Sequence, residues 1–482
     1  MRNLTLLTDL YQLTMMYGYH KCGMEDNRAV FDMFYRQQTD TMNYAIFAGL
    51  EQLIDYVADL HFDPKDLEYL DSLGLFDQSF LDRLANFRFT GDLDAVPEGT
   101  LVFPGEPLVR VNAPIFQAQL VETALLNIVN HQTLIATKAG RVTQAAGENA
   151  SVLEFGLRRA QGPDAGIYGA RAAVIGGCAS TSNVLTGQMF GIPVSGTHAH
   201  SWVMSFPDEL SAFRAYAKCF PNACLLLVDT YDTLKSGLPN AIKVFQELRA
   251  AGHEPLGIRL DSGDLAYLSR EARRMLDEAG FPEAKICASG DLDEMLIRDL
   301  KLQGACIDIW GVGTKLITSA DCPALGGVYK LSAELVDGHY VPKIKISENP
   351  AKITNPGVKM LYRVYDGDGM AVADLIALDH ERFDPAQPLT LFDPVDTWKT
   401  MTLANYTMKK LLVPVFVAGE QVYQSPSLLE IQAHCREDLA TFWDQYKRLL
   451  NPHRYKVDLS DELWMLKQSM LKHGAESVQA QK

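Results

Sequence analysis

Short apolar runs alternate with segments of helical periodicity through the middle of the chain. Each run ends in polar residues, and the runs begin at Val152, Ile192, Leu225, Leu256, Ile286 and Ile307. The polar ends follow one another at steps of about 30 residues, which is room for one strand and one helix. Between two of them, Ala241, Phe245 and Leu248 recur at helical spacing, and a similar stripe precedes Gly280. The pattern predicts parallel strands covered by helices.

The polar residues at the strand ends indicate how such a sheet is arranged. They follow every predicted strand, from the Gly-Thr-His-Ala-His run that ends at His200 to the Gly-Val-Gly-Thr turn that ends at Thr314. A site built from the carboxyl ends of successive strands is typical of an α/β barrel. A doubly wound open sheet is the alternative, but it normally gathers its site at one switch point. We therefore predict an α/β fold with a closed barrel.

The segments that flank the barrel have a different pattern. Residues from about 85 to 117 and from about 325 to 425 contain short strands with turns, and such flanks commonly meet as one second α+β domain. The predicted divisions are 1–150 for the N-terminal part of that domain with linking helices, 151–335 for the barrel with the active site, 336–425 for the return to the second domain, and 426–482 for a helical tail.

Length and charge narrow the class of protein. A chain of 482 residues is long enough for two domains. Its net charge of −16 argues against a nucleic-acid partner, because phosphate backbones are bound by clustered Lys and Arg. An acidic enzyme with an anionic substrate must concentrate positive charge locally, so individual arginines carry more information than the total.

Cysteine usage and hydropathy bear on the compartment. Eight cysteines are scattered without a CxxC pair, which argues against a zinc site or a dense disulfide framework and favours a reducing compartment. Asp9 interrupts the first residues before a long apolar core forms, so they make a poor signal peptide. No apolar stretch approaches the ~20 residues that span a bilayer. We expect a cytoplasmic protein with no membrane partner.

Two glycine turns follow consecutive predicted strands. Gly311-Val-Gly313-Thr314 ends one strand, and Ser289-Gly290-Asp291 ends the strand before it. Backbone N–H groups in such turns can hold a phosphate at the strand ends of a barrel. A tight turn with no ligand is the commoner explanation of either motif alone. Two turns on neighbouring strands favour a phosphate site.

Carboxylates and histidines follow three other strands. Asp232 and Asp264 fit helix caps, whereas Asp229 and Asp261 come directly after their strands and are better placed for function. A carboxylate near a phosphorylated sugar can bind Mg²⁺ or stabilise a cationic sugar. His198 and His200 lack a third ligand at zinc-like spacing. We favour His200 as functional, with Asp229 as its orienting partner.

An aromatic residue and two arginines end a further strand, in Phe155-Gly-Leu-Arg158-Arg159. The planar fork of arginine suits pyrophosphate or carboxylate, and a Phe face suits a flat heteroaromatic ring. The alternative, to which we give equal weight, is that Phe155 is part of the core and that the two arginines lie on the surface without a ligand.

Taken in order, the motifs resemble those of the nicotinate phosphoribosyltransferases. The matching stretches are Leu7-Thr-Asp-Leu-Tyr11-Gln-Leu-Thr-Met, Phe155-Gly-Leu-Arg-Arg, Gly196-Thr-His-Ala-His200, Leu227-Val-Asp-Thr-Tyr-Asp232, Arg259-Leu-Asp-Ser-Gly-Asp264, Gly311-Val-Gly-Thr314 and Thr354-Asn-Pro-Gly357. The resemblance implies an irregular α/β barrel with a second domain, homodimers with sites at the subunit interface, and Mg²⁺. It also implies that nicotinate and 5-phosphoribosyl 1-pyrophosphate give nicotinate mononucleotide and pyrophosphate, coupled to ATP hydrolysis.

The same resemblance implies roles for individual residues. His200 matches the histidine that ATP phosphorylates, and Asp229 and Asp261 complete the catalytic set. The positions that match the nicotinate site are Tyr11, Phe155, Thr197 and Arg259. The positions that match the phosphoribosyl pyrophosphate site are Arg158, Ser289, Gly290, Gly311, Gly313 and Thr314. Neither the resemblance nor the spacing assigns the metal ligands.

Three other functions remain as alternatives. A nicotinamide phosphoribosyltransferase should place an acidic acceptor opposite the amide, whereas Ala179-Ser-Thr-Ser-Asn183 offers neutral groups and Arg259 suits a carboxylate. A barrel aldolase or isomerase needs a Schiff-base lysine or an enolising base at a strand end, and Lys330 is the one candidate in the sequence. The full set of Asp, Arg and His side chains argues against a non-catalytic binding protein.

Overall fold

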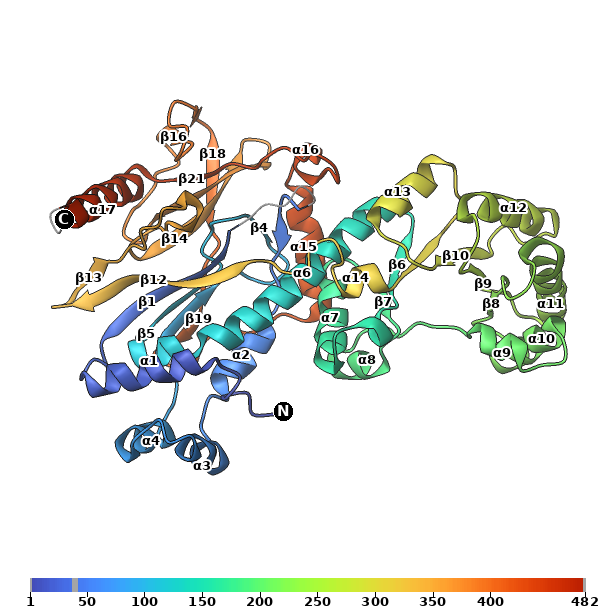
Figure 1. The fold of residues 1–482 in the computed structure, drawn as a ribbon. Coiled ribbons are helices and arrows are strands. Elements are labelled where there is room, and N and C mark those ends of the chain that lie inside the picture. Colours follow the sequence, from blue (N-terminus) through green and yellow to red (C-terminus); the bar gives the residue numbers. More distant parts are fainter. Residues whose placement is uncertain (1, 37–41, 480–482) are drawn as a thin grey trace. The chain divides into compact units, whose positions relative to one another are not determined.

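The computed structural model describes residues 2–36 and 42–479 (Figure 1). The chain forms two compact units, which we call unit 1 (residues 1–134 and 324–482) and unit 2 (residues 135–323). Helix α6 (Glu122–Ala146) belongs to both. Unit 1 also includes β12 (Gly327–Val336), which lies within the 151–335 segment predicted for the barrel, because this strand pairs with β1 (Arg28–Tyr35).

Unit 2 is built on one parallel sheet. Its strands, in spatial order, are β7 (Ser180–Thr181), β6 (Ser151–Glu154), β11 (Ile309–Val312), β10 (Lys285–Ser289), β9 (Gly257–Leu260) and β8 (Leu225–Leu227). Each ladder between neighbouring strands is parallel. The predicted mixed α/β class and the parallel pairing are therefore confirmed.

The closed barrel is not formed by hydrogen bonds. Within residues 135–323, all of which are described, no ladder joins the edge strands β7 and β8. The run that begins at Ile192 was predicted as a strand, but it contributes only a parallel bridge between Thr181 and Val194. Pro193 has no N–H to donate, so the contact is limited to the Pro193 carbonyl, which accepts from Thr181, and the Ser195 amide, which donates back.

The helices of unit 2 connect these strands. They are α7 (Pro163–Ile175), α8 (Val184–Phe190), α9 (His200–Met204), α10 (Glu209–Cys219), α11 (Leu238–Ala250), α12 (Leu265–Glu278), α13 (Glu294–Leu302) and α14 (Thr314–Ile317), with the single turns η1 (Leu157–Arg159) and η2 (Thr233–Gly237). The predicted stripe on α11 is confirmed, since Ala241, Phe245 and Leu248 are buried. Gly252 and Gly280 follow α11 and α12 with positive φ, as expected of helix stops.

The strands of unit 1 form separate sheets. Among the described residues, an antiparallel seven-stranded sheet has the order β13 (His339–Pro342), β12, β1, β5 (Val109–Pro114), β3 (Asp92–Ala95), β19 (Val413–Val417) and β20 (Glu420–Gln421). A second sheet has the order β18 (Tyr406–Lys410), β14 (Lys359–Asp366), β15 (Ala371–Leu378) and β21 (Val457–Leu459). Two small pairs are β16 (Leu389–Phe392) with β17 (Thr400–Leu403), and β2 (Ala45–Ile46) with β4 (Leu101–Val102).

The helices of unit 1 come from both ends of the chain. Besides the start of α6 they are α1 (Leu10–Lys21), α2 (Leu50–Ala58), α3 (Pro64–Ser72), α4 (Gln78–Ala85), α5 (Ile115–Leu120), α15 (Leu428–Ala440), α16 (Asp444–Lys447) and α17 (Asp461–Gln479), with the turn η3 (Pro350–Lys352). The predicted helical tail also contains a strand, β21, which pairs with β15. No helix in the described part of the chain is long and apolar enough to cross a bilayer.

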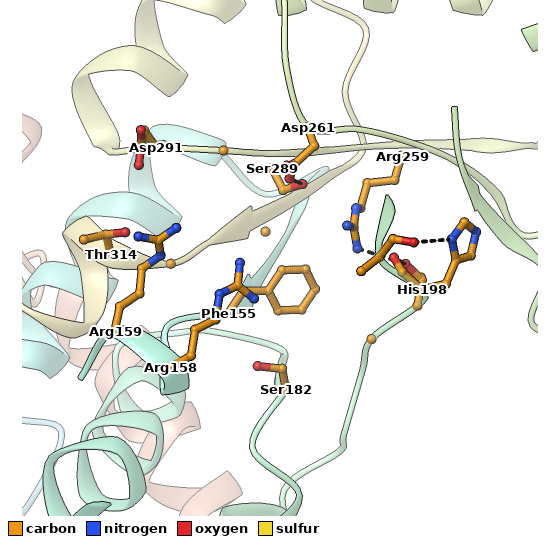
Figure 2. Close-up of a pocket in the computed structure, with 16 residues that line it drawn as sticks. Phe155, Arg158, Arg159, Ser182, His198, Arg259, Asp261, Ser289, Asp291 and Thr314 are labelled. Carbon is orange, nitrogen blue, oxygen red and sulfur yellow. Dashed lines mark hydrogen bonds between the residues drawn. The ribbon is translucent and has the colours of Figure 1, made fainter. Parts of the chain in front are cut away.

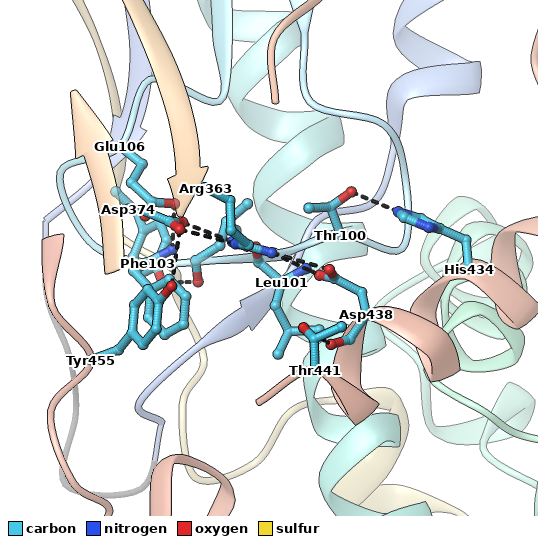
Figure 3. A network of polar contacts seen from close by, with 12 residues as sticks. Thr100, Leu101, Phe103, Glu106, Arg363, Asp374, His434, Asp438, Thr441 and Tyr455 are labelled. Atoms are coloured by element: carbon cyan, nitrogen blue, oxygen red, sulfur yellow. Dashed lines mark hydrogen bonds and ion pairs between the residues drawn. The ribbon is translucent and has the colours of Figure 1, made fainter. Parts of the chain in front are cut away.

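A buried ion cluster lies in the core of unit 1 (Figure 3). The Arg363 side chain on β14 is fully buried, and its Nε and Nη2 donate to the two carboxylate oxygens of Asp374 at 2.9 and 2.7 Å. Its Nη1 donates to Asp438 on α15 at 2.9 Å, and Nη2 also donates to the Leu101 carbonyl at 2.6 Å. Because each buried charge has several partners, the cluster ties β14, β15 and α15 together.

Candidate active site

A cavity of about 440 Å³ lies at the carboxyl ends of the strands in unit 2 (Figure 2). The predicted site residues that line it are Phe155, Arg158, Thr197, Arg259, Asp261, Ser289, Gly290, Gly311, Gly313 and Thr314. Because carboxyl ends of parallel strands meet at one edge of a sheet, residues more than 150 positions apart come together here.

Arg259, on β9, has donors left for a ligand. Its Nη1 donates to the hydroxyl of Thr197 at 2.9 Å. Its Nε is buried and has no hydrogen-bond partner. Arg259 lines the cavity, so its guanidinium can also donate to an anionic ligand there. The guanidinium is therefore arranged to receive a carboxylate or phosphate oxygen.

The Phe155 ring lies directly against Gly311 on β11. A Cβ atom at Gly311 would stand 2.6 Å from the Phe155 ring, so a side chain at that position would displace the ring. After Phe155 the chain enters the single turn η1, which carries Arg158 and Arg159. Figure 2 shows both guanidinium groups beside the same cavity as the Phe155 ring. An aromatic face and two cations thus share one site.

Asp261 and Ser289 join two neighbouring strand ends. The Ser289 hydroxyl donates to Asp261 Oδ1. Gly290 follows with φ of 96°, and a Cβ there would lie 2.5 Å from the Asp261 carbonyl oxygen. The turn therefore requires glycine for its backbone conformation and for its close approach to Asp261. The second carboxylate oxygen of Asp261 faces His200.

His200 lies beside two carboxylates. Its Nε2 is 3.8 Å from Asp261 Oδ2 and 4.0 Å from Asp229 Oδ1, and its Nδ1 lies 3.1 Å from the Thr230 hydroxyl. The Asp229 side chain is 2% exposed, and its Oδ2 accepts from the Asp261 amide at 2.9 Å and from the Ser262 hydroxyl at 2.6 Å. The expected proximity of Asp229 to His200 is thus found, and Asp261 is a second neighbour of the ring.

His198 has different surroundings. Its Nε2 accepts from the Leu227 amide at 3.3 Å, and its ring packs at 4.7 Å from that of Tyr216. Burial lowers the pKa of His198 to about 4, so the ring is neutral at physiological pH. In the described part of the chain, no three His, Cys, Asp or Glu side chains are grouped to hold a metal. His198 also lines the cavity, but the fold already uses its Nε2, so we interpret its role as structural.

Profiles of one family match nearly the whole chain. The N-terminal domain of nicotinate phosphoribosyltransferase (NAPRTase) matches residues 6–130, the NAPRTase family profile matches residues 150–367, and the C-terminal domain matches residues 358–467. A nicotinate phosphoribosyltransferase of Bacillus subtilis is 49% identical over 464 residues, which are 96% of this chain and 94% of that one. The chain belongs to the nicotinate phosphoribosyltransferase family.

Solved structures agree with this family. The crystal structure of human nicotinic acid phosphoribosyltransferase superposes with a TM-score of 0.85 at 32% identity, covering 96% of this chain and 99% of that chain. A nicotinate-nucleotide pyrophosphorylase from Pyrococcus furiosus superposes with a TM-score of 0.69 at 22% identity, covering 91% and 96%. The second likeness shows the fold alone.

Some residues that line the cavity were not predicted as site residues, and three predicted residues, Tyr11, Asp229 and His200, are not among those that line it. The additional lining residues are Arg159, Ser182, Gly196, His198, Ala199 and Asp291. All of them lie within stretches that the sequence analysis singled out, and Ser182 belongs to the neutral stretch from 179 to 183. Tyr11 belongs to α1 in unit 1, where its side chain is 49% exposed.

Proposed function

We propose that this chain converts nicotinate and 5-phosphoribosyl 1-pyrophosphate to nicotinate mononucleotide and pyrophosphate. The observation that carries the proposal is that Arg259, held by the Thr197 hydroxyl, lines the same cavity as Phe155 and Arg158. One cavity then offers a donor for a carboxylate, a face for an aromatic ring and a cation for a phosphate. The names of the family's members agree with this chemistry.

The nicotinate base is proposed to bind with its carboxylate on Arg259. Thr197 holds the guanidinium through its hydroxyl at 2.9 Å, and Phe155 supplies an aromatic face. The role of Tyr11, which is half-exposed on α1 of unit 1, stays a prediction from the resemblance alone. A nicotinamide ring could place only its amide oxygen on the guanidinium, because its N–H₂ group needs an acceptor that a guanidinium does not supply, whereas both carboxylate oxygens of nicotinate can accept. The geometry therefore favours nicotinate over nicotinamide.

The sugar phosphate is proposed to bind at the opposite rim. Arg158 would neutralise the pyrophosphate, while the backbone N–H groups of Ser289–Gly290 and of Gly311–Thr314 would hold phosphate oxygens. When the bond from C1 of the ribose to pyrophosphate breaks, positive charge develops on the sugar. The Asp261 carboxylate would stabilise that charge more in the transition state than in the ground state.

Mg²⁺ is proposed as the cofactor. Mg²⁺ usually keeps several waters and binds through one or two carboxylates plus substrate phosphates. Asp261 and Asp291 line the cavity and supply such oxygen ligands. When bound, the ion would neutralise charge on the leaving pyrophosphate. Asp261 would still hold its place through Ser289, whose hydroxyl donates to it.

ATP is proposed as a co-substrate that phosphorylates His200. The γ-phosphoryl group would leave ADP and bond to a ring nitrogen, and later hydrolysis would release phosphate and restore the histidine. Thr230 holds Nδ1 at 3.1 Å, which leaves Nε2 toward Asp229 and Asp261 as the nitrogen available for transfer. Asp229 is the proposed orienting residue for that ring.

Labelled ATP tests the histidine directly. The γ-phosphate label should become bound to the protein in an acid-labile, base-stable form. His200→Ala should abolish the label and the stimulation by ATP while some transfer without ATP remains. His198→Ala is the matched control and should keep the label, since His198 is held as a neutral acceptor. Label that persists in His200→Ala would remove His200 from this role.

An irregular barrel is the finer fold that we infer for unit 2. The strands follow one another in sequence from β6 to β11, and the last strand pairs with the first. That cyclic order is the order of a barrel, and it differs from the reversed order of a doubly wound sheet. The gap between β7 and β8 is where the Thr181–Val194 bridge stands.

A homodimer in the cytoplasm is the proposed form of the enzyme. Helix α8 exposes Val184, Leu185 and Met189 at 70%, 49% and 47%, an apolar face of the kind that subunit contacts cover. No disulfide joins any of the eight cysteines, all of which lie in the described part of the chain, in keeping with a reducing compartment. Sedimentation of the purified chain tests the dimer.

One assay tests the proposed function. Purified protein is given phosphoribosyl pyrophosphate and Mg²⁺ with either nicotinate or nicotinamide, each with and without ATP. We expect mononucleotide from nicotinate to form much faster than from nicotinamide, and ATP to stimulate the nicotinate reaction. Equal rates with both bases would contradict the role of Arg259, and an absence of product with either base would contradict the proposed reaction.

A further inference from the structure

A fully buried carboxyl group lies behind the cavity and has no place in the chemistry described above. Glu154 is the last residue of β6, is 0% exposed and does not line the cavity. In unit 2, where every residue is described, no Lys, Arg or His forms an ion pair with it. Its hydrogen-bond partners are neutral groups.

Two of these hydrogen bonds join two strand ends. Glu154 Oε1 accepts from the amide of Gly156, and Oε2 accepts from the Thr181 hydroxyl at 2.6 Å. The Thr181 hydroxyl accepts in turn from the Asn183 amide at 3.0 Å. The backbone carbonyl of Glu154 accepts from Ser182 at 2.9 Å. One residue thus connects the end of β6 with the end of β7.

The residues that these hydrogen bonds connect include, or directly adjoin, residues whose side chains line the cavity. Gly156 stands between Phe155 and the turn that presents Arg158, and Ser182 follows Thr181 directly. Figure 2 shows Phe155, Arg158 and Ser182 on the same side of the cavity. Position 156 has no room for a side chain, since a Cβ would lie 2.4 Å from Ile317 and 2.8 Å from Glu154 Oε1.

From these contacts we propose that Glu154 is a positioning residue, which fixes the strand ends that carry Phe155, Arg158 and Ser182. The inference rests on the proposed function for the identity of the substrates. A shift of about 1 Å in such groups can cost as much as 100-fold in rate. Loss of the two hydrogen bonds would therefore weaken substrate binding and not only the fold.

The hydrogen-bonding role needs no negative charge. Burial raises the pKa of Glu154, against which the bonds from Thr181 and Gly156 lower it. A glutamine in its place has an oxygen for the Gly156 amide and an N–H₂ group for the Thr181 hydroxyl, which retains acceptor capacity. Glu154→Gln should therefore rescue what Glu154→Met loses.

The chain offers a matched control in the same unit. Glu209 on α10 is 4% exposed, accepts from the neutral Ser236 hydroxyl and from the Asn240 amide at 2.9 Å, and does not line the cavity. Glu209→Met removes a buried carboxyl group with neutral partners away from the cavity. It should lower the thermal midpoint while KM for nicotinate stays within about twofold of wild type.

The experiment compares KM, kcat and amide hydrogen exchange in these variants. Glu154→Met should raise KM for nicotinate about fivefold or more, since each lost hydrogen bond is worth about 1 kcal/mol. Amides at 155–159 and 181–183 should exchange faster in Glu154→Met but not in Glu209→Met. Glu154→Gln should recover most of the loss in KM. Wild-type KM and exchange in folded Glu154→Met, or failure of Glu154→Gln to recover, would overturn the proposal.

A second pair decides the question if Glu154→Met does not fold. Thr181→Val removes the hydroxyl that joins Glu154 to the Asn183 amide, and Thr181→Ser restores it. We expect Thr181→Val to raise KM and exchange at 181–183, and Thr181→Ser to reverse both. No change in Thr181→Val would also overturn the proposal. The exchange readout needs no turnover, so an inactive wild-type protein would contradict the proposed reaction and leave this test intact.

Discussion

Arg363 in unit 1 and Arg259 in unit 2 both lie on sheet strands, but their hydrogen bonding differs. Arg363 donates through all three of its nitrogens, to Asp374, Asp438 and the Leu101 carbonyl. Arg259 donates to the neutral Thr197 hydroxyl, and its buried Nε has no partner. A buried polar group without a partner costs free energy. The fold satisfies the first arginine fully and leaves the second with an unpaired donor.

The carboxylates of the two regions differ in the same way. Asp374 and Asp438 each accept from the Arg363 guanidinium, and Tyr455 adds a bond to Asp374 at 3.1 Å. Asp229 and Asp261 accept from hydroxyl and amide groups, and the ring of His200 lies 3.8–4.0 Å from them. Carboxylates that are fully paired with a cation stabilise the core of unit 1, whereas the carboxylates at the strand ends of unit 2 lack such a cation and can still interact with a substrate.

The largest expected effect is on the stability of unit 1. Arg363→Met should lower the free energy of unfolding by about 3–5 kcal/mol, because it leaves Asp374 and Asp438 buried without their cation. Urea denaturation measures this change. Arg28→Met is the control, since Arg28 is half-exposed and pairs with Asp92 at 2.8 Å, and a pair of that kind contributes about 1 kcal/mol or less. An equal loss of unfolding free energy in Arg363→Met and Arg28→Met would contradict the stabilising role given to the buried cluster.

The next effect is on the chemical step in unit 2. Asp261→Asn should reduce kcat by about 10²–10³-fold, since the charge that stabilises the cationic sugar is lost, while circular dichroism stays as in wild type. Asp264→Asn is the matched control because Asp264 caps α12 through the Tyr267 amide, and Asn caps as well as Asp. Wild-type turnover in Asp261→Asn would remove Asp261 from the mechanism.

The third effect is on nicotinate binding. Arg259→Ala should raise KM for nicotinate by about 10- to 150-fold, because a lost hydrogen bond to a charged group is worth about 1.5–3 kcal/mol. Its unfolding free energy should change far less than that of Arg363→Met, since the fold leaves Nε unpaired. Steady-state kinetics and urea denaturation of both variants measure the two quantities. A KM that stays at the wild-type value would exclude Arg259 from the base site.

The last effect is a pH dependence of stability at His198. Burial lowers its pKa in the folded state to about 4, whereas an unfolded histidine titrates near 6.5. Between these values the unfolded state binds more protons, so stability is present above pH 6.5 and is lost as the pH falls toward 4, by at most about 1.4 kcal/mol per pH unit.

Denaturation at several pH values measures this contribution. His198→Gln has no proton to gain, so the stability advantage of wild type over this variant should shrink between pH 6.5 and 4. An advantage that is constant across this window would show that His198 titrates alike in the folded and unfolded states, and the neutral structural role assigned to it would fail.

Much of the fold was predictable because it follows from local patterns. The stripe on α11, the stops at Gly252 and Gly280, and the parallel strands follow from the spacing of apolar residues and from backbone preferences. The segment after Ile192 was predicted wrongly, because its apolar residues resemble a strand while Pro193 limits the pairing to one bridge. The assignment of β12 depended on its partner β1, which lies about 300 residues earlier in sequence.

By itself the sequence determined which residue types end each strand, and hence that Phe155, Arg259, Asp261 and the two glycine turns belong to one edge of a parallel sheet. It did not decide which polar groups are satisfied by the fold. His198 and His200 are two residues apart, yet one accepts from a buried amide and the other faces two carboxylates. Only tertiary structure decides this, because hydrogen bonding and burial depend on partners that are distant along the chain.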